Sequence, residues 1–115
     1  MTTPSTMPKL PAMTEAELLK SVKELAQIFG WEFYHPYLSI RSAKGWPDVA
    51  LCRPPRLILA ELKREGKRPT PSQEHWLDLL QGCEMYSDYP PMSRSGLEVY
   101  VWRPADLEQI VHLLR

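Results

Sequence analysis

The chain has 115 residues, of which 43% are hydrophobic and 24% charged, and this is the composition of one ordinary globular domain. Its 14 lysines and arginines balance 14 aspartates and glutamates, so the formal net charge is zero. This balance excludes a protein that coats nucleic acid through overall basicity, and any phosphate-binding surface must be local. Two cysteines are too few for a disulfide framework or a cysteine-rich zinc site. No apolar run reaches the length of a membrane span or signal peptide, so we expect a cytoplasmic protein with no membrane partner.

Residues 1–13 carry three prolines among threonines and serine, which predicts a disordered N-terminal tail before a single domain over residues 14–115. Helical signals begin at Thr14, where Thr14 and Glu17 fit a capping box. An apolar stripe from Leu18 to Phe29 follows, and Gly30 ends the helix.

The two acids at this helix start have different positions. Glu15 lies three, four and seven residues before apolar positions of the stripe, so it heads the inward face. The capping box accounts for Glu17, and Glu15 is left as a candidate for a buried site. The alternative is that Glu15 is only a favourable charge at a helix N-terminus.

Aromatic residues over 31–35 predict the first strand, which ends at Pro36. The following loop carries hydroxyl and cationic side chains of the kind that contact phosphates. We take His35 either as a packed, hydrogen-bonded residue or as a substrate contact. The nucleic-acid candidates in the loop itself are Arg41, Ser42 and Lys44.

The centre of the chain predicts a hairpin of two buried strands, Val49–Cys52 and Leu57–Ala60. With residues 53–56 as a four-residue turn, Cys52 faces Leu57. A thiol in such a strand is expected to be packed in the core.

The same register places Asp48 opposite Glu61, with Cβ atoms roughly 4.5–5.5 Å apart. Lys63 lies two residues beyond Glu61 and points to the same face. Two carboxylates this close repel each other unless a proton or a cation lies between them. Their oxygens suit Mg²⁺ or Mn²⁺, which could polarise a phosphoryl group and activate water, with Lys63 placed to orient the nucleophile. The alternative is a surface ion pair between Glu61 and Lys63 or Arg64.

A basic tract follows, in which Arg64, Lys67 and Arg68 provide a local phosphate-binding patch or simply a solvated loop. A second helix is predicted over 71–81, with Thr70 and Gln73 in another capping box. Gln73 heads a face otherwise made for the core, so its amide needs a partner. If Gln73 has only a structural role, that partner is the backbone N–H of the helix N-cap. If it has a functional role, the partner is the Lys63 end of the site or a phosphate.

Residues 84–96 are predicted to be a loop, 97–103 a final strand and 106–114 a closing helix. The predicted order of helix, strand, strand, strand, helix, strand, helix favours an α/β sandwich, with a central mixed sheet covered by helices on both sides.

Gly-Trp-Pro-Asp ending at Asp48, Glu-Leu-Lys over residues 61–63 and Pro-Ser-Gln ending at Gln73 occur in this order between the expected helices. The pattern resembles the PD-(D/E)XK nuclease superfamily and, more closely, the small VRR-NUC domains that are common in phages. The likeness runs from about residue 14 to the C-terminus. It implies a restriction-endonuclease-like fold and an endonuclease that needs Mg²⁺ or Mn²⁺ and no organic cofactor. It also implies a DNA substrate, branched or flapped DNA included, a cytoplasmic location in a bacterium or a phage-infected cell, and a homodimer.

By this resemblance the metal ligands are Asp48, Glu61 and the Leu62 carbonyl. Lys63 positions the water, Gln73 and Glu15 support the site, and His35 and Arg41 contact the substrate. The 84–96 loop is longer than the resemblance leads us to expect. The competing hypothesis is a non-catalytic nucleic-acid-binding or partner-binding module on a nuclease scaffold, and a third is an RNA nuclease with the same metal chemistry.

Overall fold

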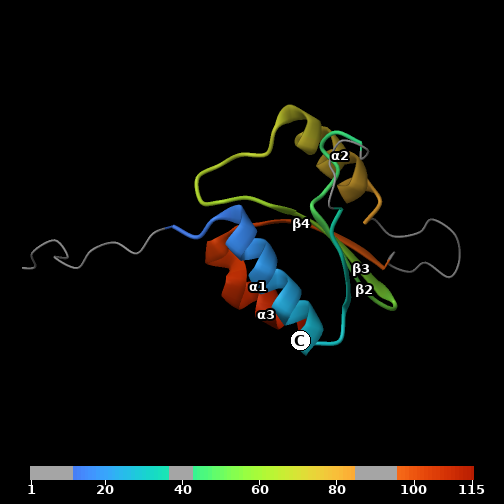
Figure 1. Cartoon of the computed structure of the whole chain (residues 1–115). Helices are drawn as coiled ribbons and strands as arrows, with labels where there is room; N and C mark the ends of the chain where they lie inside the picture. Colours follow the sequence, from blue (N-terminus) through green and yellow to red (C-terminus); the bar gives the residue numbers. More distant parts are fainter. Residues whose placement is uncertain (1–11, 37–42, 85–95) are drawn as a thin grey trace, which may run out of the picture.

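The computed structural model describes residues 12–36, 43–84 and 96–115 and has the α/β architecture shown in Figure 1. The predicted order of elements is confirmed, with a short 3₁₀ helix added before the last α-helix. Residues 1–11 of the predicted tail over 1–13 and most of the predicted 84–96 loop lie outside the described residues. The elements are α1 (Glu15–Ile28), β1 (Glu32–Tyr34), β2 (Val49–Arg53), β3 (Arg56–Leu62), α2 (Pro71–Gly82), β4 (Leu97–Trp102), η2 (Pro104–Asp106) and α3 (Leu107–Leu114).

The sheet is mixed, with the strand order β1-β2-β3-β4. β1 and β3 both run antiparallel to β2, and β4 runs parallel to β3. Cys52 pairs with Leu57, as the hairpin register predicted. The predicted four-residue turn is wrong, because Arg53 pairs with Arg56 and only two prolines remain between the strands. The shorter turn leaves the register unchanged, since it adds one more pair to the same ladder.

One face of the sheet packs against α1 and α3, which lie side by side beneath it in Figure 1. The alternation along β2 and β3 sends every second side chain to this face. These side chains meet the apolar stripe of α1 and the buried residues of α3, and the result is the main core. Its fully buried members include Leu18, Val22, Ala26, Leu51, Ile58, Ala60, Ile110 and Leu114.

The opposite face is covered by α2, which contacts β4. Its buried side chains include Leu59, Val99 and Leu77. The expectation that Cys52 is a packed thiol is wrong, because Cys52 is exposed. Its partner Leu57 is exposed as well, so the cover over this face does not extend to the turn end of the hairpin.

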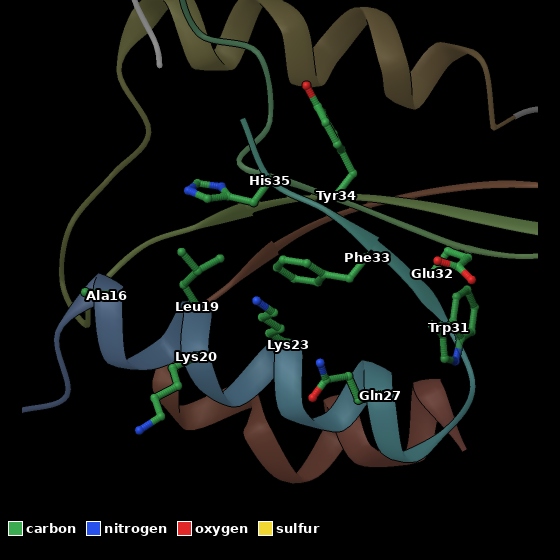
Figure 2. Close-up of a pocket in the computed structure, with 10 residues that line it drawn as sticks. All are labelled: Ala16, Leu19, Lys20, Lys23, Gln27, Trp31, Glu32, Phe33, Tyr34 and His35. Atoms are coloured by element: carbon green, nitrogen blue, oxygen red, sulfur yellow. The ribbon is translucent and has the colours of Figure 1, made fainter. Parts of the chain in front are cut away.

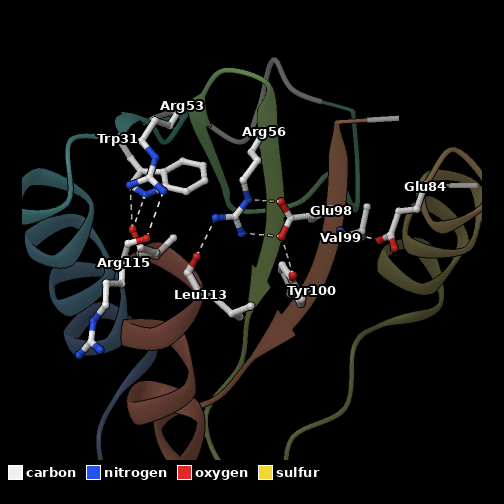
Figure 3. Close-up of polar contacts among 10 residues, drawn as sticks. Trp31, Arg53, Arg56, Glu84, Glu98, Val99, Tyr100, Leu113 and Arg115 are labelled. Carbon is white, nitrogen blue, oxygen red and sulfur yellow. Dashed lines mark hydrogen bonds and ion pairs between the residues drawn. The ribbon is translucent and has the colours of Figure 1, made fainter. Parts of the chain in front are cut away.

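Arg53 and Arg56, at the turn end of the hairpin, donate hydrogen bonds to backbone carbonyls at the end of α3 (Figure 3). The guanidinium carbons of Arg53 and Arg56 lie 4.6 and 4.9 Å from the centroid of the Trp31 ring, within cation–π range. Arg53 donates to the carbonyl of Leu114 at 3.0 Å, and Arg56 forms a two-pronged ion pair with Glu98 at 2.6 and 2.8 Å. This end of the sheet is thus built for stability, and the functional candidates lie at the opposite end of β2 and β3.

None of the helices in the described ranges has both the length and the apolar character needed to cross a bilayer.

Candidate active site

Asp48 and Glu61 lie at the end of the hairpin away from its turn. Val49 pairs with Ala60, so Asp48 and Glu61 form the next opposed position of the ladder and share a face. The carboxylate of Asp48 is fixed by a 2.8 Å hydrogen bond that its Oδ2 accepts from the backbone N–H of Leu62. The expected convergence of these acids is therefore present in the structure.

Glu61 is almost completely buried, with 1% of its surface exposed. Its Oε1 accepts a 2.9 Å hydrogen bond from the amide nitrogen of Gln73 and lies 3.7 Å from Nζ of Lys63. Its Oε2 is also buried, and it has no hydrogen-bond partner in the part of the chain that the structure describes. Lys63 is only 5% exposed, so the predicted alternative of a surface ion pair is wrong for Glu61 and Lys63.

Burial raises the pKa of Glu61 to about 9, and the neighbouring Asp48 adds to this through a shared hydrogen bond and its charge. Glu15 raises this pKa further by its charge, whereas Lys63 lowers it. A protonated Glu61 can donate its proton to Asp48, which provides the missing partner for the buried oxygen. At neutral pH the site thus holds a proton where a cation could lie.

Glu15 reaches the site from the first turn of α1, whereas Glu17 does not. Thr14 and Glu17 form the predicted capping box, with the hydroxyl of Thr14 accepting from the N–H of Glu17 at 3.1 Å. Glu15 lines a cavity of about 180 Å³ together with Asp48, Leu62 and His35. Its Oε1 is buried and, within the described ranges, has no hydrogen-bond partner. Leu62, whose carbonyl is a predicted metal ligand, thus borders the same cavity as two of the acids.

His35 follows β1, which is shorter than the predicted strand over 31–35. Its Nδ1 lies 2.7 Å from the backbone carbonyl of Asp48. A carbonyl oxygen can only accept, so Nδ1 carries the hydrogen in this bond. This bond agrees with the predicted alternative that His35 is a hydrogen-bonded residue. His35 also borders the cavity of Asp48 and Glu15.

The side chain of Gln73 contacts both the N-cap of α2 and the buried acid at the Lys63 end of the site. Its Oε1 accepts from the N–H of Thr70 at 2.8 Å and its backbone N–H donates to the hydroxyl of Thr70, which completes the capping box. Its Nε2 donates to Oε1 of Glu61, the oxygen that also lies 3.7 Å from Nζ of Lys63. One amide thus caps α2 and orients a buried carboxyl group.

The segment that leads to Asp48 is held against the start of α2. Gly45 has φ +87°, and a Cβ atom there would lie 2.3 Å from the carbonyl oxygen of Ser72. Trp76 donates its ring N–H to the carbonyl of Lys44 at 3.1 Å and packs edge-on against Trp46, with 5.0 Å between ring centroids. Only glycine fits at position 45, because the turn needs a positive φ and the two backbones touch.

The predicted basic contacts are only partly near the acids. Arg64 and Lys67 line a hollow of about 310 Å³ that also includes Glu15. Lys44 and Arg68 are exposed, and neither lines the cavities around Asp48 and Glu15. Arg41 and Ser42 lie outside the described residues.

Sequence reasoning missed a larger hollow between α1 and β1, of about 680 Å³, which includes Lys20, Lys23 and Phe33. It borders the acidic cavity, since both include Ala16, Leu19 and His35. The signal was present, because residues 16, 19, 20, 23 and 27 follow the spacing of one helix face.

The acids alone do not form a complete metal cage. Within residues 12–36, 43–84 and 96–115, no three His, Cys, Asp or Glu side chains are grouped closely enough to hold an ion. Two carboxylates and one backbone carbonyl still fit Mg²⁺, which keeps several waters and needs few protein ligands. The buried oxygens of Glu61 and Glu15 described above, and the pKa of Glu61, indicate that a cation would be favourable here.

Comparison with known proteins was negative throughout: no family model, no curated protein and no solved structure matches this chain.

Proposed function

We propose that this chain is a divalent-metal-dependent endonuclease that hydrolyses phosphodiester bonds in DNA, with the restriction-endonuclease-like fold of the PD-(D/E)XK superfamily. The observation that carries the proposal is the environment of Glu61. Its carboxyl group is buried between Asp48, Gln73 and Lys63, and its pKa is raised to about 9. The mixed four-stranded sheet between helices is compatible with this fold.

A purely structural role explains this cluster poorly. Burying an acid beside a second acid costs free energy, and an apolar pair at the same positions would avoid that cost. Strongly shifted pKa values in a cavity are typical of functional sites. The cavity of Glu15, Asp48 and Leu62 opens beside this cluster, so a ligand has access to the carboxyl groups of Glu15 and Asp48.

Asp48, Glu61 and the Leu62 carbonyl would hold Mg²⁺ or Mn²⁺, which when bound supplies Lewis-acid activation of the phosphate and of water. Gln73 keeps Oε1 of Glu61 in place, and the N–H of Leu62 does the same for Asp48. His35 fixes the peptide of Asp48. These fixed bonds leave the remaining carboxylate oxygens for the ion.

Lys63 would position the attacking water and stabilise negative charge on the phosphate. Its Nζ is held 3.7 Å from Glu61 Oε1, so it is directed to the site and not to solvent. In the reaction, water adds to phosphorus and loses a proton. The bond from phosphorus to a sugar oxygen breaks, and the leaving oxygen takes up a proton.

The test is cleavage of branched, flapped and linear DNA by the purified full-length chain, with Mg²⁺ or Mn²⁺ or with EDTA. We expect cutting only with metal, and a loss of about 100-fold or more in Lys63→Ala and in Asp48→Asn. Glu108→Gln on α3 is the control for loss of an exposed acid and should cut normally. Circular dichroism spectra would establish that each variant is folded.

Cutting that persists in EDTA and in Lys63→Ala would refute this function, as would a failure to cut any of these DNAs. DNA affinity that is unchanged without metal, together with no cleavage, would favour the non-catalytic binding module. Cutting of RNA but not DNA would keep the metal chemistry and change the substrate.

A further inference from the structure

A hollow of the surface borders the acidic cavity between α1 and strand β1, and Figure 2 shows its lining. Its volume of about 680 Å³ is in the range of pockets that bind small organic molecules. Ala16, Leu19 and His35 belong both to this hollow and to the cavity of Asp48. A ligand in the hollow would therefore extend directly to the acids.

The lining combines an apolar surface with positive charge. Phe33 and Leu19 point into the space between the strand and the helix, and Lys23 approaches from α1 (Figure 2). Nζ of Lys23 lies 5.9 Å from the centroid of the Phe33 ring. Lys20, one residue after Leu19, adds a second exposed cation at the rim. Among the described residues that line this hollow, Glu32 is the only acid.

An aromatic ring with the Lys23 ammonium nearby, in a hollow that Lys20 also lines, matches the chemistry of a nucleotide. A base can stack on the ring and a phosphate can pair with the ammonium groups. A base inside a duplex has both faces covered by its neighbours, so it cannot use such a ring. The hollow therefore suits an unpaired nucleotide better than continuous duplex.

We propose that the hollow between α1 and β1 binds an unpaired nucleotide of the DNA substrate next to the phosphate to be cut, with Phe33 contacting the base and Lys23 and Lys20 the backbone. The inference rests on the proposed function, since it uses the acids as the cutting site. It predicts that the protein prefers single strands and flaps to continuous duplex.

The first test measures binding apart from cleavage. A fluorescently labelled oligothymidylate is titrated with the full-length chain in EDTA, and its fluorescence polarisation is followed. We expect Phe33→Leu to weaken binding about fivefold or more, since base stacking on an aromatic ring contributes at least that much. Lys23→Gln should weaken binding and lower the salt dependence by about one phosphate contact. Arg115→Gln removes an exposed charge elsewhere and should bind like the parent. A duplex of the same length should bind more weakly and be insensitive to Phe33→Leu.

The second test locates the base directly. An oligonucleotide that contains 5-iododeoxyuridine is irradiated with the protein, and the cross-linked peptide is identified by mass spectrometry. We expect the cross-link on the segment of Phe33. Lys23 is exposed, so Lys23→Gln stays informative if Phe33→Leu proves unstable in a thermal melt.

The outcomes separate this inference from the proposed function. Absence of oligonucleotide binding, normal binding by folded variants or cross-links on other segments would refute the nucleotide site, even if the protein cuts DNA. Binding that depends on Phe33 and Lys23 without any cleavage would retain the nucleotide site and refute the nuclease. Tighter binding of oligouridylate than of oligothymidylate would overturn the assignment to DNA.

Discussion

The amide nitrogen of Gln73 donates a 2.9 Å hydrogen bond to the buried carboxyl group of Glu61, while the other end of the same amide caps helix α2. The position of the carboxyl group is thus tied to the start of a helix that covers the sheet. This double role makes it possible to separate stability from site geometry by mutation.

Gln73→Ala should lose both roles. The loss of the capping interaction is expected to cost about 1 kcal/mol in the free energy of unfolding, and the loss of the bond to Glu61 should lower cleavage at least about tenfold. Thr70→Ala is the matched control, because it removes the cap and leaves the bond from Gln73 to Glu61 in reach. Urea unfolding and cleavage rates measure the two effects. Equal loss of cleavage in both variants would show that Gln73 acts only through helix stability.

The raised pKa of Glu61 predicts a stability that falls with pH in metal-free protein. Glu61 keeps its proton up to about pH 9 when folded, against an ordinary value of 4.5. The folded state therefore binds more protons between these values, and the free energy of unfolding decreases as pH rises, by at most about 1.4 kcal/mol per pH unit. Urea unfolding in EDTA at pH 6, 7 and 8 should show this slope.

Two comparisons test the cause of that slope. Glu61→Gln cannot ionise, so its slope should be smaller than that of the parent. Addition of Mg²⁺ should stabilise the parent more at pH 8 than at pH 6, because an ion and a proton compete for the same carboxyl group. An identical pH slope in parent and Glu61→Gln would assign the effect to other groups.

Glu15 and Glu17 give a matched pair within one helix turn. The carboxylate of Glu15 faces the site, and its charge raises the pKa of Glu61. Glu15→Gln removes this charge. We expect weaker Mg²⁺ affinity, by about tenfold, with little change in stability. Glu17→Gln keeps an oxygen for the capping box with Thr14 and should bind Mg²⁺ like the parent. Isothermal titration with Mg²⁺ measures both. Equal affinities in the two variants would remove Glu15 from the site.

Gly45 and Gly30 both have positive φ values, +87° and +77°, but different surroundings. Gly30→Ala adds a Cβ with no atom of the described chain within 4 Å, so only backbone strain of about 1–2 kcal/mol is expected. Gly45→Ala adds the same strain and a clash with the backbone of Ser72. Its loss in the free energy of unfolding should reach about 3 kcal/mol or more. Cleavage should fall as well, since the segment before Asp48 has to move. Equal losses in urea unfolding would contradict the close contact.

Local signals in the sequence predicted much of the fold. The capping boxes at Thr14 and Thr70 depend on neighbours a few residues apart, so the starts of α1 and α2 were predicted to the residue. The closing helix, which has no such signal, was predicted from residue 106 and begins at Leu107. The pairing of Cys52 with Leu57 followed from a short turn, because turn length restricts the register of a hairpin. That register brought Asp48 and Glu61 to the same face. Their role in metal binding and cleavage remains a prediction.

The amino-acid sequence by itself thus determined the order of elements, the hairpin register and the identity of the acids that meet, since these depend on short-range periodicity and turn chemistry. Only the tertiary structure decided that Cys52 is exposed, that Gln73 bonds to Glu61 and that Lys20, Lys23 and Phe33 border the site. The physical reason is that burial and contact between separate elements depend on how helices lie across the sheet. That arrangement results from packing summed over the whole core, which no local pattern encodes.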